Sequence, residues 1–226
     1  MTAFVLGATG FVGREVVRQL AVRATPVVAH VRPKSAAEWT PKLEALGAKV
    51  DTSEWDAAAL SAAIDAAAAN QLYVLIGTTK SRAKSESVDG DIYEKIDYGL
   101  TRIAVDAAIA SKAKPRLVYL SGLGADANAR GAYMKARGKA EDAVRSSGLA
   151  WVIARPAIIT GERDESRPGE RAGAIVGDGL LAVAGLFSKN VKAKWSSTTP
   201  DVLASALIRI GESSEHDRVF DGQALR

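Results

Sequence analysis

The sequence predicts an α/β fold built on a doubly wound parallel sheet, and three observations lead to this prediction. Short apolar runs alternate six times with helix-like segments, which is the pattern of successive βαβ units. The run 72–76 is apolar at every position, as expected of a strand buried on both faces of a parallel sheet. Glycines at three-residue intervals separate the first strand from the first helix.

Composition indicates one soluble globular domain. Of 226 residues, 47% are hydrophobic and 25% are charged, so the chain can bury a sizeable core. The absence of cysteine excludes disulfides, cysteine–zinc sites and a cysteine nucleophile. We expect residues 1–226 to form one nucleotide-binding domain, with residues from about 157 onward contributing the substrate side.

Charge and targeting signals argue against nucleic-acid and membrane partners. The net charge of +4 comes from mixed charges without a long basic tract. The longest apolar run near the end, 180–187, is shorter than the ~20 residues that a membrane-spanning helix needs. The first strand begins at Ala3 and leaves no room for a leader, so we expect a cytoplasmic protein.

The elements follow in chain order. Hydrophobic periodicity and turn signals predict them as follows: strand 3–6, helix 11–23, strand 27–31, helix 38–46, strand 48–51, helix 56–69, strand 72–76, loop 80–90, helix 92–111, strand 117–120, helix 133–147 and strand 150–154. Beyond Pro156 the pattern weakens. There we expect a loop over 161–179, short elements at 180–187 and 191–195, and a helix over 202–210.

The glycine turn predicts a site for a dinucleotide pyrophosphate. Gly7 permits the tight turn, Gly10 lets the backbone approach the phosphates, and Gly13 lets the helix lie close to the strand. The unpaired N–H groups at the helix start then face an anion. The alternative is a glycine turn with a purely structural role.

A basic pair after the second strand favours NADP(H) over NAD(H). Arg32 follows this strand directly, Lys34 comes two residues later, and no carboxylate lies between 27 and 37. In a dinucleotide fold an acidic residue here accepts the ribose 2′-hydroxyl, whereas arginine accommodates a 2′-phosphate. The alternative is a solvated basic turn.

Reduction of a carbonyl requires a proton donor and stabilisation of the developing alkoxide. Tyr133 and Arg137 lie four residues apart, and so on one helix face, after a strand that ends at Ser121. Tyr98 and Arg102 have the same spacing, but they lie in the middle of a helix, where we expect packing.

These motifs together resemble the short-chain dehydrogenase/reductase superfamily, whose fold is Rossmann-like. The GATGFVG turn at 7–13 and the order Ser121, Tyr133, Arg137 look like its atypical, extended-type members. The strings LIGTTK at 75–80 and ESRPGE at 165–170 are similar to the branch named for a human Tat-interacting protein.

The resemblance implies roles for individual residues. Residues implied to bind the cofactor are Gly7, Thr9, Gly10, Phe11, Val12, Gly13, Arg32, Gly77, Thr78, Thr79, Pro156 and Ile159. Lys34 is expected to bind the cofactor from its position near Arg32 alone. Ser121 would orient the substrate, Tyr133 would be the acid/base and Arg137 the neighbouring cation. The family has lysine at this last position, and the arginine keeps the charge but cannot relay a proton.

Two functions remain open at this point. The chain is either an NADP(H)-dependent oxidoreductase of a small carbonyl or alcohol, or an NADP(H)-binding sensor with little turnover. Redox-neutral epimerisation with a tightly held cofactor is a third option. The expected partner is a small-molecule substrate, a homodimer is possible, and we expect no metal site.

Overall fold

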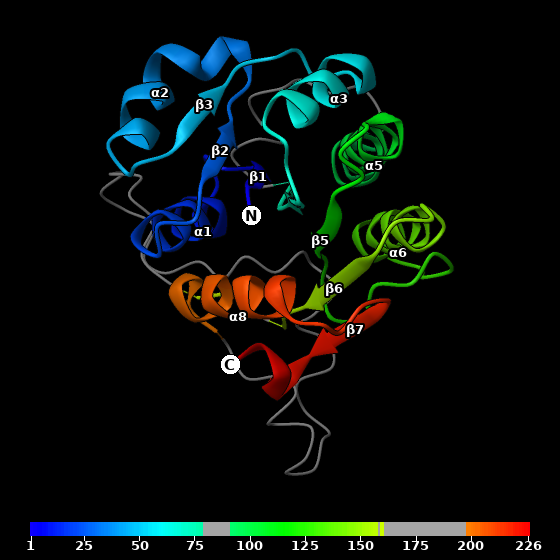
Figure 1. Cartoon of the computed structure of the whole chain (residues 1–226). Helices are drawn as coiled ribbons and strands as arrows, with labels where there is room; N and C mark the ends of the chain where they lie inside the picture. Colours follow the sequence, from blue (N-terminus) through cyan, green and yellow to red (C-terminus); the bar gives the residue numbers. More distant parts are fainter. Residues whose placement is uncertain (79–90, 158, 161–197) are drawn as a thin grey trace, which may run out of the picture.

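The computed structural model describes residues 1–78, 91–157, 159–160 and 198–226. Its centre is a seven-stranded sheet in the order β3-β2-β1-β4-β5-β6-β7, in which every neighbouring pair is parallel. Helices cover both faces of the sheet (Figure 1). The structure therefore confirms the predicted doubly wound, Rossmann-like α/β fold.

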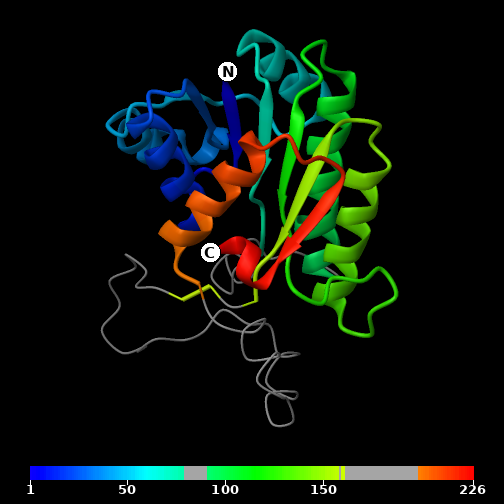
Figure 2. The ribbon, with the colours of Figure 1, turned by 60° about the horizontal axis from the view of Figure 1, so that its bottom comes forward.

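The strands are short, and the central strands β1 and β4 are buried along their whole length. Their bounds are β1 Ala3–Leu6, β2 Val27–His30, β3 Lys49–Asp51, β4 Gln71–Val74, β5 Arg116–Leu120, β6 Trp151–Arg155 and β7 Arg218–Asp221. Figure 2 shows them side by side, from the blue β1 through the green β5 to the red β7. Apolar side chains fill both sides of the central strands because helices pack against each face.

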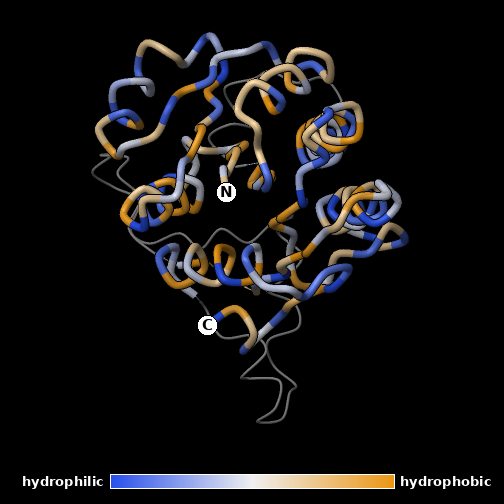
Figure 3. The backbone as a smooth tube through the Cα atoms, in the orientation of Figure 1, coloured by the Kyte–Doolittle hydropathy of each residue, from blue (hydrophilic) through white to orange (hydrophobic). Residues whose placement is uncertain are grey.

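The helices form one layer on each face. Their bounds are α1 Phe11–Val22, η1 Pro33–Ser35, α2 Ala36–Glu44, α3 Ala57–Ala66, η2 Glu94–Gly99, α5 Leu100–Ala110, α6 Ala132–Arg145, α8 Pro200–Glu212 and η3 Gly222–Leu225. Residues of α1 and α8 share one core cluster with alternate strand residues, and residues of α3, α5 and α6 share the other. Hydrophilic and apolar residues alternate along each helix, as expected when one face is buried (Figure 3).

Two element predictions need correction. The helix predicted over 56–69 ends at Ala66, and Ala68 has a positive φ of 47°, which a continuing helix does not allow. The sequence analysis also missed β7, whose strand carries only two apolar residues in a charged segment. The predicted loops at 80–90 and 161–179, and the elements at 180–187 and 191–195, lie outside the described residues.

The helix predicted over 92–111 contains an irregular segment. Residues of η2 are π-helical before the chain continues as α5. A π segment widens the helix by one residue, and such segments are frequent at functional sites. Here it places Asp97, with a fully buried side chain, beside the end of β4.

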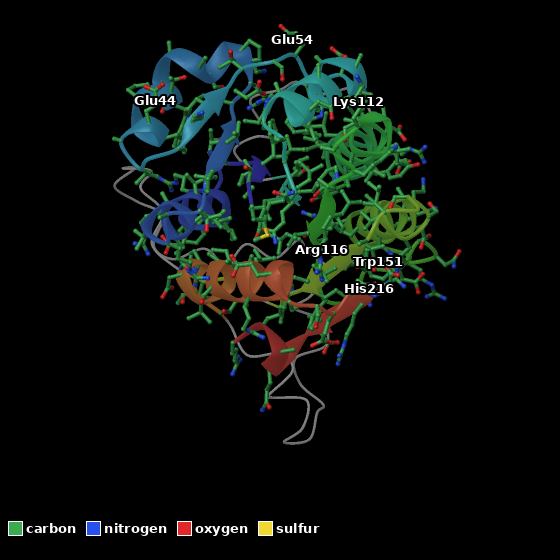
Figure 4. All side chains as sticks on the ribbon, in the orientation of Figure 1. Glu44, Glu54, Lys112, Arg116, Trp151 and His216 are labelled. Carbon is green, nitrogen blue, oxygen red and sulfur yellow. The ribbon has the colours of Figure 1, made fainter. Side chains whose placement is uncertain are left out.

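Arg116 ties the carboxyl end of α8 to the sheet. At the start of β5, its guanidinium donates to the carbonyls of Ile210 and Ser213 at the end of α8, where helical partners are lacking, and to the carbonyl of Glu215 in the segment that follows. Figure 4 shows Arg116 near Trp151 and His216, which lie at the start of β6 and just before β7. The segment after 198 is therefore joined to the sheet by polar contacts as well as by packing.

The Asp56→Ala variant is expected to lose about 1 kcal/mol of unfolding free energy, the usual cost of removing a helix N-cap. The Asp56 carboxylate caps α3 by accepting hydrogen bonds from the N–H groups of Ala58 at 3.0 Å and Ala59 at 2.9 Å. Urea unfolding measures the loss. Asp56→Asn keeps an acceptor oxygen and serves as the control, so equal losses in both variants would contradict the capping role.

None of the helices in the described ranges is long and apolar enough to cross a bilayer.

Candidate functional site

The turn after β1 has a backbone that only glycine adopts comfortably at its first position. Gly7 has a φ of 84°, and a Cβ added there would lie 2.6 Å from the carbonyl oxygen of Leu75. The N–H of Gly10 donates to the Gly7 carbonyl at 2.9 Å and closes the turn. The chain therefore reverses tightly between β1 and α1.

Gly13 lets α1 lie directly against this turn. A Cβ at Gly13 would lie 2.1 Å from the Gly7 carbonyl oxygen, a distance that no side chain could occupy. Gly10 is the N-cap of α1, no side chain caps the helix, and its first turn carries no acidic residue. The positive end of the helix dipole thus has no anionic side chain of its own, which suits an external anion.

The other residues of the turn, Thr9, Phe11 and Val12, differ in burial and so in which of their atoms could contact an anion. The side chains of Thr9 and Phe11 are half-buried at the turn. Val12 is only 6% exposed and belongs to the core, so only its backbone N–H could face a phosphate.

The predicted basic pair follows β2, which is a parallel neighbour of β1. Arg32 is half-buried and is the N-cap of η1, and Lys34 is exposed within η1. Because the carboxyl ends of parallel strands meet at one edge of a sheet, this pair lies at the same edge as the glycine turn.

The end of β4 brings the chain against α6. A Cβ on Gly77 would lie 2.5 Å from Nη2 of Arg137, so glycine makes room for the guanidinium. The N–H of Thr78 lies 3.3 Å from both carboxylate oxygens of Asp97, and the Thr78 hydroxyl also donates to this carboxylate. Thr79 lies outside the described residues.

Tyr133 lies in the first turn of α6, beside the end of β5. A Cβ on Gly122 would be 3.6 Å from its hydroxyl, so this hydroxyl lies close to the backbone that follows β5. Its ring meets that of Tyr93 edge to face, with centroids 5.4 Å apart. The phenol is half-buried.

Arg137 lies one helical turn below Tyr133 and is 5% exposed. Its guanidinium carbon lies over the Tyr133 ring, 5.4 Å from the ring centre. Nη2 pairs with Asp97 at 2.9 Å, while Nη1 donates to the carbonyl of Leu120 at 2.8 Å and to the hydroxyl of Tyr119 at 3.2 Å.

The surroundings of Arg137 fix its charge. Burial acts to lower the pKa of Arg137, but the two tyrosines and the carboxylate outweigh burial and keep its pKa well above the ordinary value. Burial also raises the pKa of Tyr119, so this phenol stays neutral beside the guanidinium. The structure thus brings Tyr133 and Arg137 together, as the sequence predicts, but with the cation held by a carboxylate.

Ser121 does not turn toward Tyr133 in this structure. Its hydroxyl donates to the buried carboxylate of Glu141 at 2.6 Å. The same carboxylate accepts hydrogen bonds from Arg155 at 2.7 and 2.6 Å and from Arg145 at 2.8 Å. The carboxylate charge is therefore well compensated, and Ser121 belongs to this network.

Pro156 and Ile159 lie after β6. Pro156 is buried and its carbonyl accepts from the N–H of Leu123 at 2.9 Å, which ties the ends of β5 and β6 together. Ile159 is half-buried and forms a parallel bridge with Thr198.

The sequence reasoning missed two acidic residues of the site. Neither Asp97 nor Glu141 is among the residues that the sequence analysis predicts for the site. The one available signal was spacing, since Glu141 lies four residues after Arg137 and so on the same helix face. Within the described ranges, no group of three or more His, Asp or Glu side chains could hold a metal ion.

Comparison with known proteins agrees with this geometry. Residues 7–178 match a family model described as NAD(P)H-binding. Protein FMP52, mitochondrial, of Candida albicans is 32% identical over 173 residues, which cover 74% of this chain and 70% of the relative.

Solved structures share the fold. A Bacillus halodurans protein assigned as an NAD-dependent epimerase/dehydratase has a TM-score of 0.69 at 18% identity, covering 97% of this chain and 92% of its own. The NADPH-dependent quinone oxidoreductase QOR2 of Escherichia coli, solved with NADPH, has a TM-score of 0.63 at 21% identity, covering 98% of this chain and 68% of its own.

The expected cytoplasmic location is wrong by this comparison, because the fungal relatives are named mitochondrial proteins. The expectation depends on the lack of a recognisable leader before the first strand. A cellular address is read by receptors from short signals and does not follow from the composition of the fold.

Proposed function

The chain belongs to the NAD(P)H-binding family, and from this premise we propose that it is an NADP(H)-dependent oxidoreductase acting on a small carbonyl or alcohol. The proposal places it in the short-chain dehydrogenase/reductase superfamily, near the branch named for a human Tat-interacting protein. It takes NADP(H) in preference to NAD(H) as the cofactor.

The glycine turn is the observation that carries the proposal. At Gly10 an added Cβ would meet only the Gly7 carbonyl oxygen, 3.1 Å away, so the backbone is open to a ligand beside a helix start without a side-chain cap, which fits a pyrophosphate group. Gly7, Gly10 and Gly13 would hold this group through backbone N–H groups and close approach. Arg32 would accept the additional 2′-phosphate at the neighbouring strand end.

Two side chains of α6, which lie beside the segments that follow β4 and β5, fit the chemistry. A bound nicotinamide supplies the hydride. Tyr133 would give its phenolic proton to the substrate oxygen, and the guanidinium of Arg137 beside the ring would stabilise the phenolate that remains. Gly77 and Thr78 line the same edge of the sheet and would lie beside the cofactor.

Calorimetry and turnover test the proposal together. The protein is titrated with NADPH and with NADH, and NADPH oxidation is then followed with a panel of small aldehydes, ketones and quinones. We expect tighter binding of NADPH and turnover with at least one carbonyl class. Absence of binding by either coenzyme would remove the basis of every role assigned above.

The Arg32→Gln variant is expected to weaken NADPH binding about tenfold to 100-fold, which matches the ~1.5–3 kcal/mol of a hydrogen bond to a charged group. NADH lacks the 2′-phosphate, so its affinity should stay within about threefold of the wild-type value. Arg102→Gln removes an exposed guanidinium on α5 and serves as the control. Equal losses for both coenzymes would contradict the assignment of Arg32.

An NADP(H)-binding sensor with little turnover is the second candidate, and two contacts favour it. The Ser121 hydroxyl donates to Glu141, and the charge of Arg137 is paired with Asp97. Both groups that would assist the reaction are thus engaged by carboxylates. NADPH binding without turnover on any carbonyl of the panel would select this function.

The cellular context completes the proposal. We propose a mitochondrial location, because the fungal relatives are named mitochondrial proteins. Fractionation of cells that express the tagged protein tests this location. We keep a small molecule as the substrate and a homodimer as the assembly, with no nucleic-acid or membrane partner. Light scattering of the purified protein tests the assembly.

A further inference from the structure

We propose that Asp97 is a positioning residue, which holds Arg137 against the ring of Tyr133 and ties the end of β4 to the proton donor. This inference rests on the proposed oxidoreductase function. It assigns a task to a residue that does not itself reach the phenol.

The first argument is the burial of the Asp97 carboxylate. Its side chain is fully buried, and a buried carboxylate is tolerated only when charge and hydrogen bonds compensate it. The compensation comes from Nη2 of Arg137 at 2.9 Å and from the N–H and hydroxyl of Thr78. One carboxylate therefore joins α6 to the loop that follows β4.

The second argument is that the backbone presents Asp97 from a specialised segment. It lies in the π-helical η2, and its own carbonyl accepts a hydrogen bond from the Thr101 hydroxyl at 2.7 Å. This hydrogen bond from the Thr101 side chain gives the Asp97 carbonyl a partner within the irregular turn. The widened turn is thus a stable way to aim the carboxylate inward.

The third argument concerns the type of cation. The planar guanidinium of Arg137 reaches Asp97 with one terminal nitrogen and the carbonyl of Leu120 with the other. A lysine ammonium is a single point charge and cannot span both partners in this fixed geometry. The arginine that departs from the family pattern is therefore matched to Asp97.

The fourth argument is the space around the pair. A side chain at Gly77 would collide with Nη2 of Arg137 at 2.5 Å. The Nε of Arg137 is buried and has no hydrogen-bond partner among the described residues. The position of the guanidinium thus depends on its two terminal nitrogens, and Asp97 supplies the only charge among their described partners.

The test compares the Asp97→Asn variant with wild type by NMR of the arginine side chains in nitrogen-labelled protein. In the wild type, Arg137 should give resolved terminal N–H signals because the buried guanidinium cannot rotate, and Arg137→Lys identifies them by their loss. We expect Asp97→Asn to broaden or merge these signals. Unchanged Arg137 signals would overturn the proposal whether or not the protein turns over.

The control is an exposed ion pair of the same type. Arg102 pairs with Asp106 at 2.9 Å on the exposed face of α5. Asp106→Asn should leave the Arg137 signals and the basal activity unchanged. A change in the Arg137 signals of this control would show that loss of any carboxylate perturbs them, and would also count against the proposal.

A kinetic cycle separates positioning from a general structural role. Asp97→Asn should lower kcat about tenfold to 100-fold, the range expected for a misplacement of about 1 Å, with the KM for NADPH nearly unchanged. In an Arg137→Met background the same substitution should change kcat by less than about twofold, because its effect passes through Arg137. If the kcat losses of the two single variants multiply in the double variant, Asp97 acts independently of Arg137, and the proposal is overturned.

The outcomes also separate this inference from the proposed function. A wild-type protein that binds NADPH but reduces no carbonyl would contradict the oxidoreductase, and the NMR comparison would still decide whether Asp97 holds Arg137. Turnover in the wild type with unaltered Arg137 signals in Asp97→Asn would leave the oxidoreductase in place and remove the role of Asp97.

Discussion

The Tyr133→Phe variant is expected to lose about 10²–10⁴-fold in kcat, the range that a positioned general acid contributes. Phenylalanine keeps the ring that packs beside Tyr93 and over Arg137 but removes the hydroxyl near Gly122. The glycine turn is untouched, so NADPH affinity should stay within about threefold, or ~0.7 kcal/mol. Steady-state NADPH oxidation and calorimetry on the same preparations measure the two quantities.

Tyr98→Phe is the matched control for this variant. Tyr98 precedes Arg102 by four residues, as Tyr133 precedes Arg137, but its half-buried ring packs within the helical layer. The ammonium of Lys139 lies over this ring, 5.5 Å from the centroid. Phenylalanine keeps the ring and therefore this contact, so the loss of the Tyr98 hydroxyl should leave turnover unchanged. Full turnover in Tyr133→Phe, or an equal loss in Tyr98→Phe, would contradict the assignment of the acid.

The Gly13→Ala variant is expected to weaken NADPH binding at least about 100-fold, or ~2.7 kcal/mol. The added methyl would lie 2.1 Å from the Gly7 carbonyl oxygen, which is backbone and cannot move aside without opening the turn. Overpacking of this kind also costs about 1–3 kcal/mol of stability. Calorimetry with NADPH and thermal unfolding measure both losses.

Gly99→Ala separates the effect of the turn from that of any glycine replacement. Gly99 has helical dihedral angles, and a Cβ there would lie 3.4 Å from the carbonyl oxygen of Glu94, an ordinary contact. Alanine is favoured over glycine in helices by about 1 kcal/mol, so this variant should be at least as stable as wild type. NADPH affinity retained by a folded Gly13→Ala protein would show that the turn is not the binding site.

The central part of the fold could be predicted from the sequence because its signals are local. Strand β1, helix α1 and the glycine turn between them follow from adjacent residues, and the predicted strand 3–6 has the same bounds as β1. The strand β7 could not be predicted, because only Val219 and Phe220 mark it. Its strand conformation depends on pairing with β6, a contact between segments distant in the chain.

In the candidate site, too, local features could be predicted from the sequence, and contacts between distant residues could not. The spacing of Tyr133 and Arg137 predicts that they share a helix face, and the structure places the guanidinium over the ring. The pairing of Arg137 with Asp97 joins residues 40 positions apart, and no local pattern indicates it. The same holds for the turn of Ser121 toward Glu141, 20 positions away.

The sequence by itself determined the alternation of strands and helices, the glycine turn and the helix that presents Tyr133, because each depends on backbone preferences and spacing within a few residues. Only the tertiary structure decided which carboxylates accompany Arg137 and Ser121. Buried charges require compensation, and folding brings together the partners that supply it from distant parts of the chain.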